Sequence, residues 1–390
     1  MSSKKSPQPT SLPWLRERTI LLTVAGSRSY GTHNPETSDL DVKGICIPPK
    51  EYLYGFLKHF EQADKPGHML PFMNLLSPEL TGVVQRTKME GSIYSLQKFM
   101  ALAADNNPNV LECLFVEEAD VLLCTPAGQK LRDNRNLFLS QAAKHRFSGY
   151  ALRQLARIKS HRHWLLNPMT EQPTRAQFGL KPQMEVDKNQ LLAVQAEVSK
   201  QLDRWHEGNI EDLEESTKIR VREGFSQLLA ELKIASDTRY TSAARSLGFE
   251  ENFIHYLQKE REFSTATQHW NQYLTWKSER NEERAKLEAK YGFDTKFGSQ
   301  LVRLLRMCRE ILTEGVVRVK RPDAAEILAV RNGAWSYEKL LAFAEQQNAE
   351  LETLLATSPL PRSSDRKALD ELCQELVEAS FSGPTNGVID

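Results

Sequence analysis

The sequence predicts an α+β fold, in which a small mixed sheet with helices forms the first third and a mainly α-helical region follows. Two observations predict the sheet. Residues 19–25, TILLTVA, are apolar and rich in β-forming side chains, and the run ends abruptly at Gly26-Ser27. Residues 38–47 place apolar side chains at alternate positions until Pro48-Pro49 ends the pattern. After about residue 120 the apolar spacing becomes helical, which predicts helices that pack on a core.

The other elements follow in chain order. We expect a flexible tail over residues 1–14, a third extended segment over 83–93 and a helix that begins at Tyr94. Amphipathic helices are predicted over 149–165 and over 299–315, the second of which ends at a glycine. The expected organisation is a first domain over residues 15–120 and a mainly helical region over 121–390, with a strongly charged section from about 205 to 290.

The composition excludes several classes of protein. The 390 residues are 40% hydrophobic, which is enough for a packed core and argues against a disordered or fibrous chain. The 51 basic and 51 acidic residues cancel, so any affinity for nucleic acid has to come from local patches. The five cysteines lack metal-site spacing and favour a reducing compartment, and no apolar run approaches the roughly 20 residues of a membrane span. We therefore expect a cytoplasmic protein that does not contact a membrane.

Two carboxylates in the second predicted strand indicate metal chemistry. Because strand side chains alternate between faces, Asp39 and Asp41 project from the same face, about 6–7 Å apart along the strand. Hard oxygen ligands of this kind suit Mg²⁺ or Mn²⁺, and two such ions can activate an attacking hydroxyl and clamp a nucleoside triphosphate. The backbone after Gly26, together with the Ser27 hydroxyl, would hold the terminal phosphates.

The string GSRSYGTHNPETSDLDVKGI, residues 26–45, resembles the signature of the DNA polymerase β superfamily, a Gly-Ser turn followed by Asp-x-Asp. The longer chain resembles the nucleotidyltransferases associated with RNA repair pathways, the RlaP group. The strings that carry this second resemblance are YSLQKFMALAADNNPNVLECLF (94–115), GYALRQLARIKSH (149–161), YGFDTKFGSQLVRLLR (291–306) and RPDAAEILAVRNGAWSYEKLL (321–341).

The resemblance implies a polymerase-β-like nucleotidyltransferase domain with Mg²⁺ or Mn²⁺ as cofactor and a nucleoside triphosphate as substrate. It also implies a third carboxylate on a neighbouring strand, for which Glu90 is our candidate, although the family commonly has Asp there. Lys296 and Arg303 share a helix face in a family-like string. They could contact a phosphate, and the alternative is that they form a surface salt bridge. The expected catalytic and metal-binding residues are Asp39, Asp41 and Glu90, and the expected nucleotide-binding residues are Gly26, Ser27, Arg28, Lys296 and Arg303.

Basic residues gather between positions 135 and 170, where no Asp or Glu occurs. Arg153, Arg157 and His161 are spaced i, i+4, i+8 and therefore share one helix face, which could contact the phosphates of an acceptor or of the incoming triphosphate. The alternative is a solvated face that pairs with acidic helices elsewhere. The three histidines of this stretch have no Cys or carboxylate nearby in the sequence, which disfavours a metal site.

Three functions are compatible with these features. The first is transfer of a nucleotide to an RNA end, such as that of a damaged tRNA, in RNA repair or processing. The second is transfer to a protein or a small molecule, which needs no groove for a polynucleotide. The third is a catalytically silent module that senses nucleotide or binds RNA. The intact pair Asp39 and Asp41 argues against the third function, and Glu90 in place of Asp keeps it open.

Overall fold

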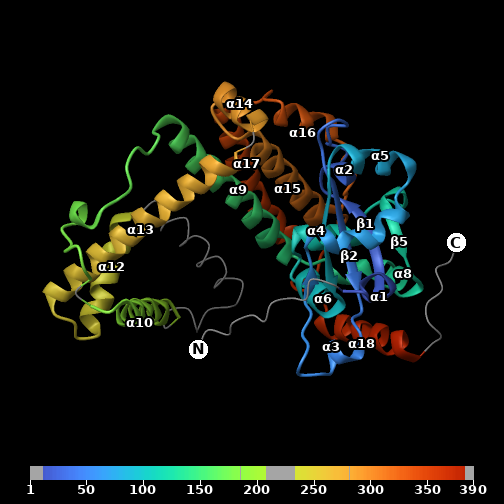
Figure 1. The fold of residues 1–390 in the computed structure, drawn as a ribbon, viewed down its shortest axis with the longest axis horizontal. Coiled ribbons are helices and arrows are strands. Elements are labelled where there is room, and N and C mark those ends of the chain that lie inside the picture. Colours follow the sequence, from blue (N-terminus) through green and yellow to red (C-terminus); the bar gives the residue numbers. More distant parts are fainter. Residues whose placement is uncertain (1–11, 185, 208–232, 281, 383–390) are drawn as a thin grey trace. The chain divides into compact units, whose positions relative to one another are not determined.

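A computed structural model describes residues 12–184, 186–207, 233–280 and 282–382 (Figure 1). Its sheet has five strands in the order β3-β4-β2-β1-β5, and β2 and β4 run parallel while the other neighbouring strands are antiparallel. This mixed sheet, followed by a mostly helical region, confirms the predicted α+β class. The strands are β1 (Thr19–Ala25), β2 (Leu40–Cys46), β3 (Gln62–Ala63), β4 (Met89–Ser95) and β5 (Val121–Cys124).

Short helices surround and connect these strands. In the first 140 residues they are α1 (Leu15–Arg18), α2 (Gly26–Tyr30), α3 (Lys50–Leu53), α4 (Pro66–Met69), η1 (Leu70–Leu75), α5 (Pro78–Arg86), α6 (Leu96–Ala104), α7 (Pro108–Leu111), η2 (Glu112–Leu114), η3 (Glu118–Asp120), α8 (Pro126–Asp133) and η4 (Arg135–Phe138). The later helices are α9 (Ala142–Leu166), η5 (Arg175–Phe178), α10 (Lys188–Glu207), α12 (Lys233–Ser246), α13 (Glu251–Glu279), α14 (Glu282–Tyr291), α15 (Thr295–Glu314), α16 (Ala324–Arg331), α17 (Tyr337–Thr357) and α18 (Arg366–Ser382).

The chain forms two compact units. Unit 1 comprises residues 1–165 and 282–390, and unit 2 comprises residues 166–281. One apolar core in unit 1 joins side chains of β1, β2, α6 and α9 to those of α15, α17 and α18, so the early and late parts of the chain share it. Unit 2 has a smaller apolar cluster of its own, formed by α10, α12 and α13. The predicted domain limits near residue 120 stay a prediction.

Helix α15 supplies much of the late half of the unit 1 core. Asp294 caps its first turn by accepting hydrogen bonds from the amides of Lys296 and Phe297, at 3.0 and 3.1 Å. The apolar positions recur at helical spacing, and their side chains are buried from Leu301 to Leu312. Gly315 ends the helix in the left-handed conformation with a φ of 66°, as the sequence predicts.

The extended segment predicted over 83–93 is wrong in its first part. Residues 83–86 belong to helix α5, and the strand begins only at Met89. The apolar Val-Val pair favours a strand, but Ser77 caps the helix by accepting from the amide of Leu80, and Pro78 occupies the first turn. The helix expected from Tyr94 is also late, because β4 continues through Ser95, which then caps α6.

The predicted tail over 1–14 lies outside the described residues up to residue 11. Leu12 is buried, and the Trp14 ring packs against the rings of Tyr52 and Phe60 at centroid distances of 5.2 and 5.0 Å. Within the charged section, residues 208–232 also lie outside the described residues. In the described ranges we find no helix that combines the length and apolarity needed to cross a bilayer.

Candidate active site

The turn that follows β1 depends on glycine. Gly26 has a φ of +65°, a conformation that residues with a Cβ rarely adopt. A Cβ built on Gly26 would lie only 2.2 Å from the Oδ2 atom of Asp41 and 3.1 Å from its Cβ. The missing side chain therefore allows the backbone of the turn and the Asp41 carboxylate to approach each other closely. The sequence signal, a strand that ends at Gly-Ser, identified this turn without showing what it faces.

The predicted acidic residues occupy adjacent strands. In the parallel β2–β4 pair Asp41 lies opposite Glu90, so their side chains share one face of the sheet, and Asp39 directly precedes β2. Glu90 forms an ion pair with Lys88 at 2.5 Å. In the described structure the three carboxylates do not all lie within 4.8 Å of one another.

The environment of Asp41 disfavours an uncompensated negative charge. Burial raises the pKa of the Asp41 carboxyl, the ammonium of Lys43 opposes this, and the charges of Asp39 and Glu90 add to it. An additional cation at this position would relieve that repulsion. The oxygen donors and this electrostatic demand fit a divalent metal ion.

Besides Gly26, two residues of the predicted nucleotide-binding set, Ser27 and Arg28, lie in the turn itself. Ser27 is half-buried, and its hydroxyl makes no hydrogen bond within the described part of the chain. Arg28 is buried, and its guanidinium donates to the carbonyl oxygens of Ser38 and Asp39 at 2.9 and 3.3 Å. The structure thus directs Arg28 at the loop that leads into Asp39 rather than at an open phosphate position.

The other two residues of the set belong to α15. Lys296 lies exposed at its N-terminus, and its ammonium interacts with the charge of Asp41. Arg303 lies two turns later and is buried. Its guanidinium pairs with Glu112 at 2.5 Å and lies 3.8 Å from the centre of the Tyr30 ring. Lys296 is therefore placed to reach a ligand beside Asp41, whereas Arg303 is occupied by its contacts with Glu112 and Tyr30.

Comparison with known proteins finds similarity to one family in the first part of the chain. Residues 11–168 match the model of the family described as "RlaP: RNA repair pathway DNA polymerase beta family". A phage T4 protein described as "Uncharacterized 38.9 kDa protein in nrdC-mobD intergenic region" is 32% identical over 143 residues, which are 36% of this chain and 38% of that protein. No solved structure matches. The RlaP family indicates a nucleotidyltransferase-like role.

The matched region, residues 11–168, ends with α9, which carries the three predicted acceptor contacts. The structure exposes two of them and turns the third into the protein. Arg153 and Arg157 are exposed, and their guanidinium groups lie over the rings of Tyr150 and Phe297 at 4.3 and 5.5 Å. Neither arginine forms an ion pair with any described residue. These two positions therefore remain open to a phosphate ligand. His161 is only 17% exposed and faces into the protein.

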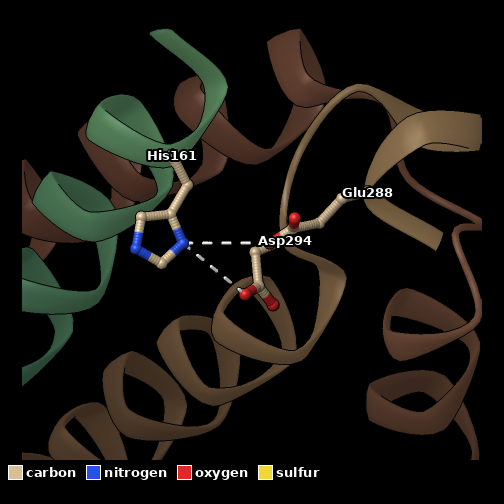
Figure 2. Close-up of side chains that lie close together, drawn as sticks. All are labelled: His161, Glu288 and Asp294. Carbon is tan, nitrogen blue, oxygen red and sulfur yellow. Dashed lines mark ion pairs between the residues drawn. The ribbon is translucent and has the colours of Figure 1, made fainter. Parts of the chain in front are cut away.

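His161 belongs to a buried charged cluster that the sequence analysis missed (Figure 2). Its Nδ1 atom lies 3.8 Å from Glu288 and 3.9 Å from Asp294, and Arg284 pairs with the same Asp294 oxygen at 2.5 Å. Burial lowers the pKa of His161, but the two carboxylates outweigh it and raise the pKa overall. For the Asp294 carboxyl, burial by itself raises the pKa, but His161 and Arg284 outweigh burial and lower the pKa to about 2. No local signal reveals this cluster, because His161 is distant in sequence from Arg284, Glu288 and Asp294.

His161, Glu288 and Asp294 are also residue types that bind metal ions, and their ligand atoms lie within 4.8 Å of one another. However, one oxygen of Asp294 already accepts two backbone amides, and the other pairs with Arg284. The guanidinium occupies the position beside Asp294 that a cation would take. We therefore interpret the cluster as an ion-pair network that connects α9 to α14 and α15.

Proposed function

We propose that this protein transfers a nucleoside monophosphate from a nucleoside triphosphate to an acceptor hydroxyl in a metal-dependent reaction. The observation that carries the proposal is the placement of Asp41 opposite Glu90, directly against the side-chain-free face of Gly26. Asp39, Asp41 and Glu90 would hold two Mg²⁺ or Mn²⁺ ions. When bound, such ions activate a hydroxyl and neutralise the charge of a triphosphate.

The residues of the chain would contribute mainly position and charge. The backbone of the turn and the free hydroxyl of Ser27 would hold the β and γ phosphates, and Lys296 would neutralise them from the side of α15. The acceptor oxygen forms a bond to the α phosphorus, the bond from that phosphorus to the bridging oxygen breaks, and pyrophosphate leaves. The proton of the acceptor hydroxyl is released to solvent. Arg28 would keep Asp39 in place through its two carbonyl contacts.

We further propose that the acceptor is an RNA end, as in a damaged tRNA. The basic face of α9 supports this choice, because Arg153 and Arg157 are exposed and have no acidic partner among the described residues. Arginine side chains of this kind track phosphates, and the binding they provide weakens as salt rises. The family description, which names an RNA repair pathway, agrees with such a substrate.

The test is incubation of the purified protein with each labelled nucleoside triphosphate, Mg²⁺ or Mn²⁺ and total RNA, followed by separation of RNA from protein. We expect label on RNA, no label with the Asp39→Ala/Asp41→Ala variant, and a steep loss of labelling with salt. Label on protein that is insensitive to salt would refute the RNA acceptor. Absence of label with retained tight binding of nucleotide would refute the transferase and favour a nucleotide sensor.

A further inference from the structure

The turn at Gly26 and the helix that carries Lys296 are connected through three side chains, of which Glu112 and Arg303 are buried and Tyr30 is partly buried. Glu112 accepts a hydrogen bond from the Tyr30 hydroxyl on one carboxylate oxygen and from the Arg303 guanidinium on the other, each at 2.5 Å. The guanidinium also lies against the Tyr30 ring. Each of the three therefore contacts both of the others, and we call Tyr30, Glu112 and Arg303 the Glu112 triad.

The triad connects the parts that would contact the nucleotide. Tyr30 ends α2, whose first residues, Gly26 and Ser27, form the turn that would hold the phosphates and is called the phosphate turn below. Arg303 lies two turns after Lys296 on the same helix, so a shift of one moves the other. Glu112 begins η2, which directly follows α7, and its side chain is buried. The triad thus sets the distance between the turn and the N-terminus of α15.

A fourth residue extends the triad to the metal-binding strand. Lys43 lies two positions after Asp41 in β2 and therefore projects from the same face of the sheet. It is the cation that acts most strongly on Asp41, and Glu112 is the anion that acts most strongly on Lys43. Negative and positive charges consequently alternate from Asp41 through Lys43 and Glu112 to Arg303.

We propose that the Glu112 triad is a positioning device for the triphosphate, which fixes the phosphate turn and Lys296 relative to each other. This inference rests on the proposed function. None of the three residues touches the reacting atoms, so they act through the groups they hold. A bare contribution to stability is the competing explanation, since removing one partner from any buried ion pair is destabilising.

The chain offers a control for that explanation in a second buried cation, although the Glu352 side chain is 45% exposed and that of Glu112 only 5%. Lys144 is buried and pairs with Glu352 at 2.5 Å, and this pair joins α9 to α17. Glu352→Gln and Glu112→Gln each remove the negative charge that neutralises a buried cation. Only Glu112 also contacts the turn. Tyr30→Phe is the mildest change to the triad, because it removes one hydroxyl and keeps the ring beneath Arg303.

The first measurement is hydrogen exchange of the full-length variants, which needs no activity. We expect the amides of residues 27–32 to exchange at least about tenfold faster in Tyr30→Phe and Glu112→Gln than in the wild type, and to remain unchanged in Glu352→Gln. Unchanged exchange at these amides in both triad variants would overturn the inference. An equal rise in the control variant would also overturn it.

The second measurement separates the two substrates. In the labelling assay we expect the KM for the nucleoside triphosphate to rise by about tenfold or more in both triad variants, and the KM for RNA to stay constant. A parallel change in both KM values, or the same change in Glu352→Gln, would contradict a role in holding the triphosphate. If the wild type transfers no nucleotide while the exchange result holds, the proposed function fails and the mechanical connection stands.

Discussion

Replacing Gly26 by alanine tests the geometry of the candidate site most directly. The new Cβ would lie 2.2 Å from Asp41 Oδ2, whereas real Cβ atoms keep at least about 3.0 Å from other atoms, so the carboxylate must move by about 1 Å. The left-handed φ of +65° adds about 1–2 kcal/mol of backbone strain for a residue with a Cβ. Displacing a reacting group by about 1 Å costs about 100-fold in rate.

We therefore expect Gly26→Ala to lower the unfolding free energy by about 1–3 kcal/mol and nucleotide transfer by about 100-fold. Chemical denaturation and the labelling assay measure these two quantities. Gly149→Ala is the matched control: no atom lies within 4 Å of its new Cβ, and the position is inside helix α9. That variant should gain about 0.5–1 kcal/mol and keep full activity. Wild-type activity in Gly26→Ala would refute the argument that Asp41 needs this space.

Three further predictions concern other parts of unit 1. His161→Asn should destabilise the protein more below about pH 6.5 than at high pH. The pKa of His161 is raised in the folded state, so its protonation stabilises the fold at low pH, and this stabilisation is lost as the pH rises through the folded-state pKa. Denaturation at a series of pH values checks this, and a difference that does not depend on pH would contradict it. Lys296→Met should raise the KM for the triphosphate by about tenfold with little loss of unfolding free energy, which steady-state kinetics and denaturation measure together. Leu305→Ala should cost about 2–5 kcal/mol of unfolding free energy, since this side chain is 2% exposed in the shared core, and a loss below about 1 kcal/mol would argue against that burial.

The sequence predicts those parts of the fold that follow from local periodicity. The limits of β1 agree with the run TILLTVA because a β-rich apolar run ends at a glycine that leaves the strand. The C-terminal end of α15 agrees because its apolar stripe and its terminal glycine are both local signals, whereas the helix begins at Thr295, four residues before the predicted start. Helix α5 was missed, since the capping Ser77-Pro78 outweighs the β preference of two valines, and this signal was available in the sequence.

The residues of the candidate site also divide into those that a local pattern reveals and those that only the tertiary fold brings together. Gly26, Asp39 and Asp41 lie within one short string, so pattern and spacing are enough to propose them, and their roles remain to be tested. Arg303 was expected at a phosphate because it shares a helix face with Lys296, which lies in a family-like string. In the structure Arg303 pairs with Glu112, which is remote in sequence, and only the tertiary fold brings them together. Buried ion pairs between distant segments have no local signature.

The division of unit 1 between two distant segments has a consequence for biosynthesis. The sheet and α9 leave the ribosome first, and the whole of residues 166–281 must be made before α15 appears. At 5–20 residues per second this interval lasts roughly 6 to 23 seconds. During that time the apolar surface that α15 will cover is open to solvent, so the nascent chain is a natural client for chaperones. Expression of residues 11–168 alone would make this state permanent, and we expect that product to aggregate.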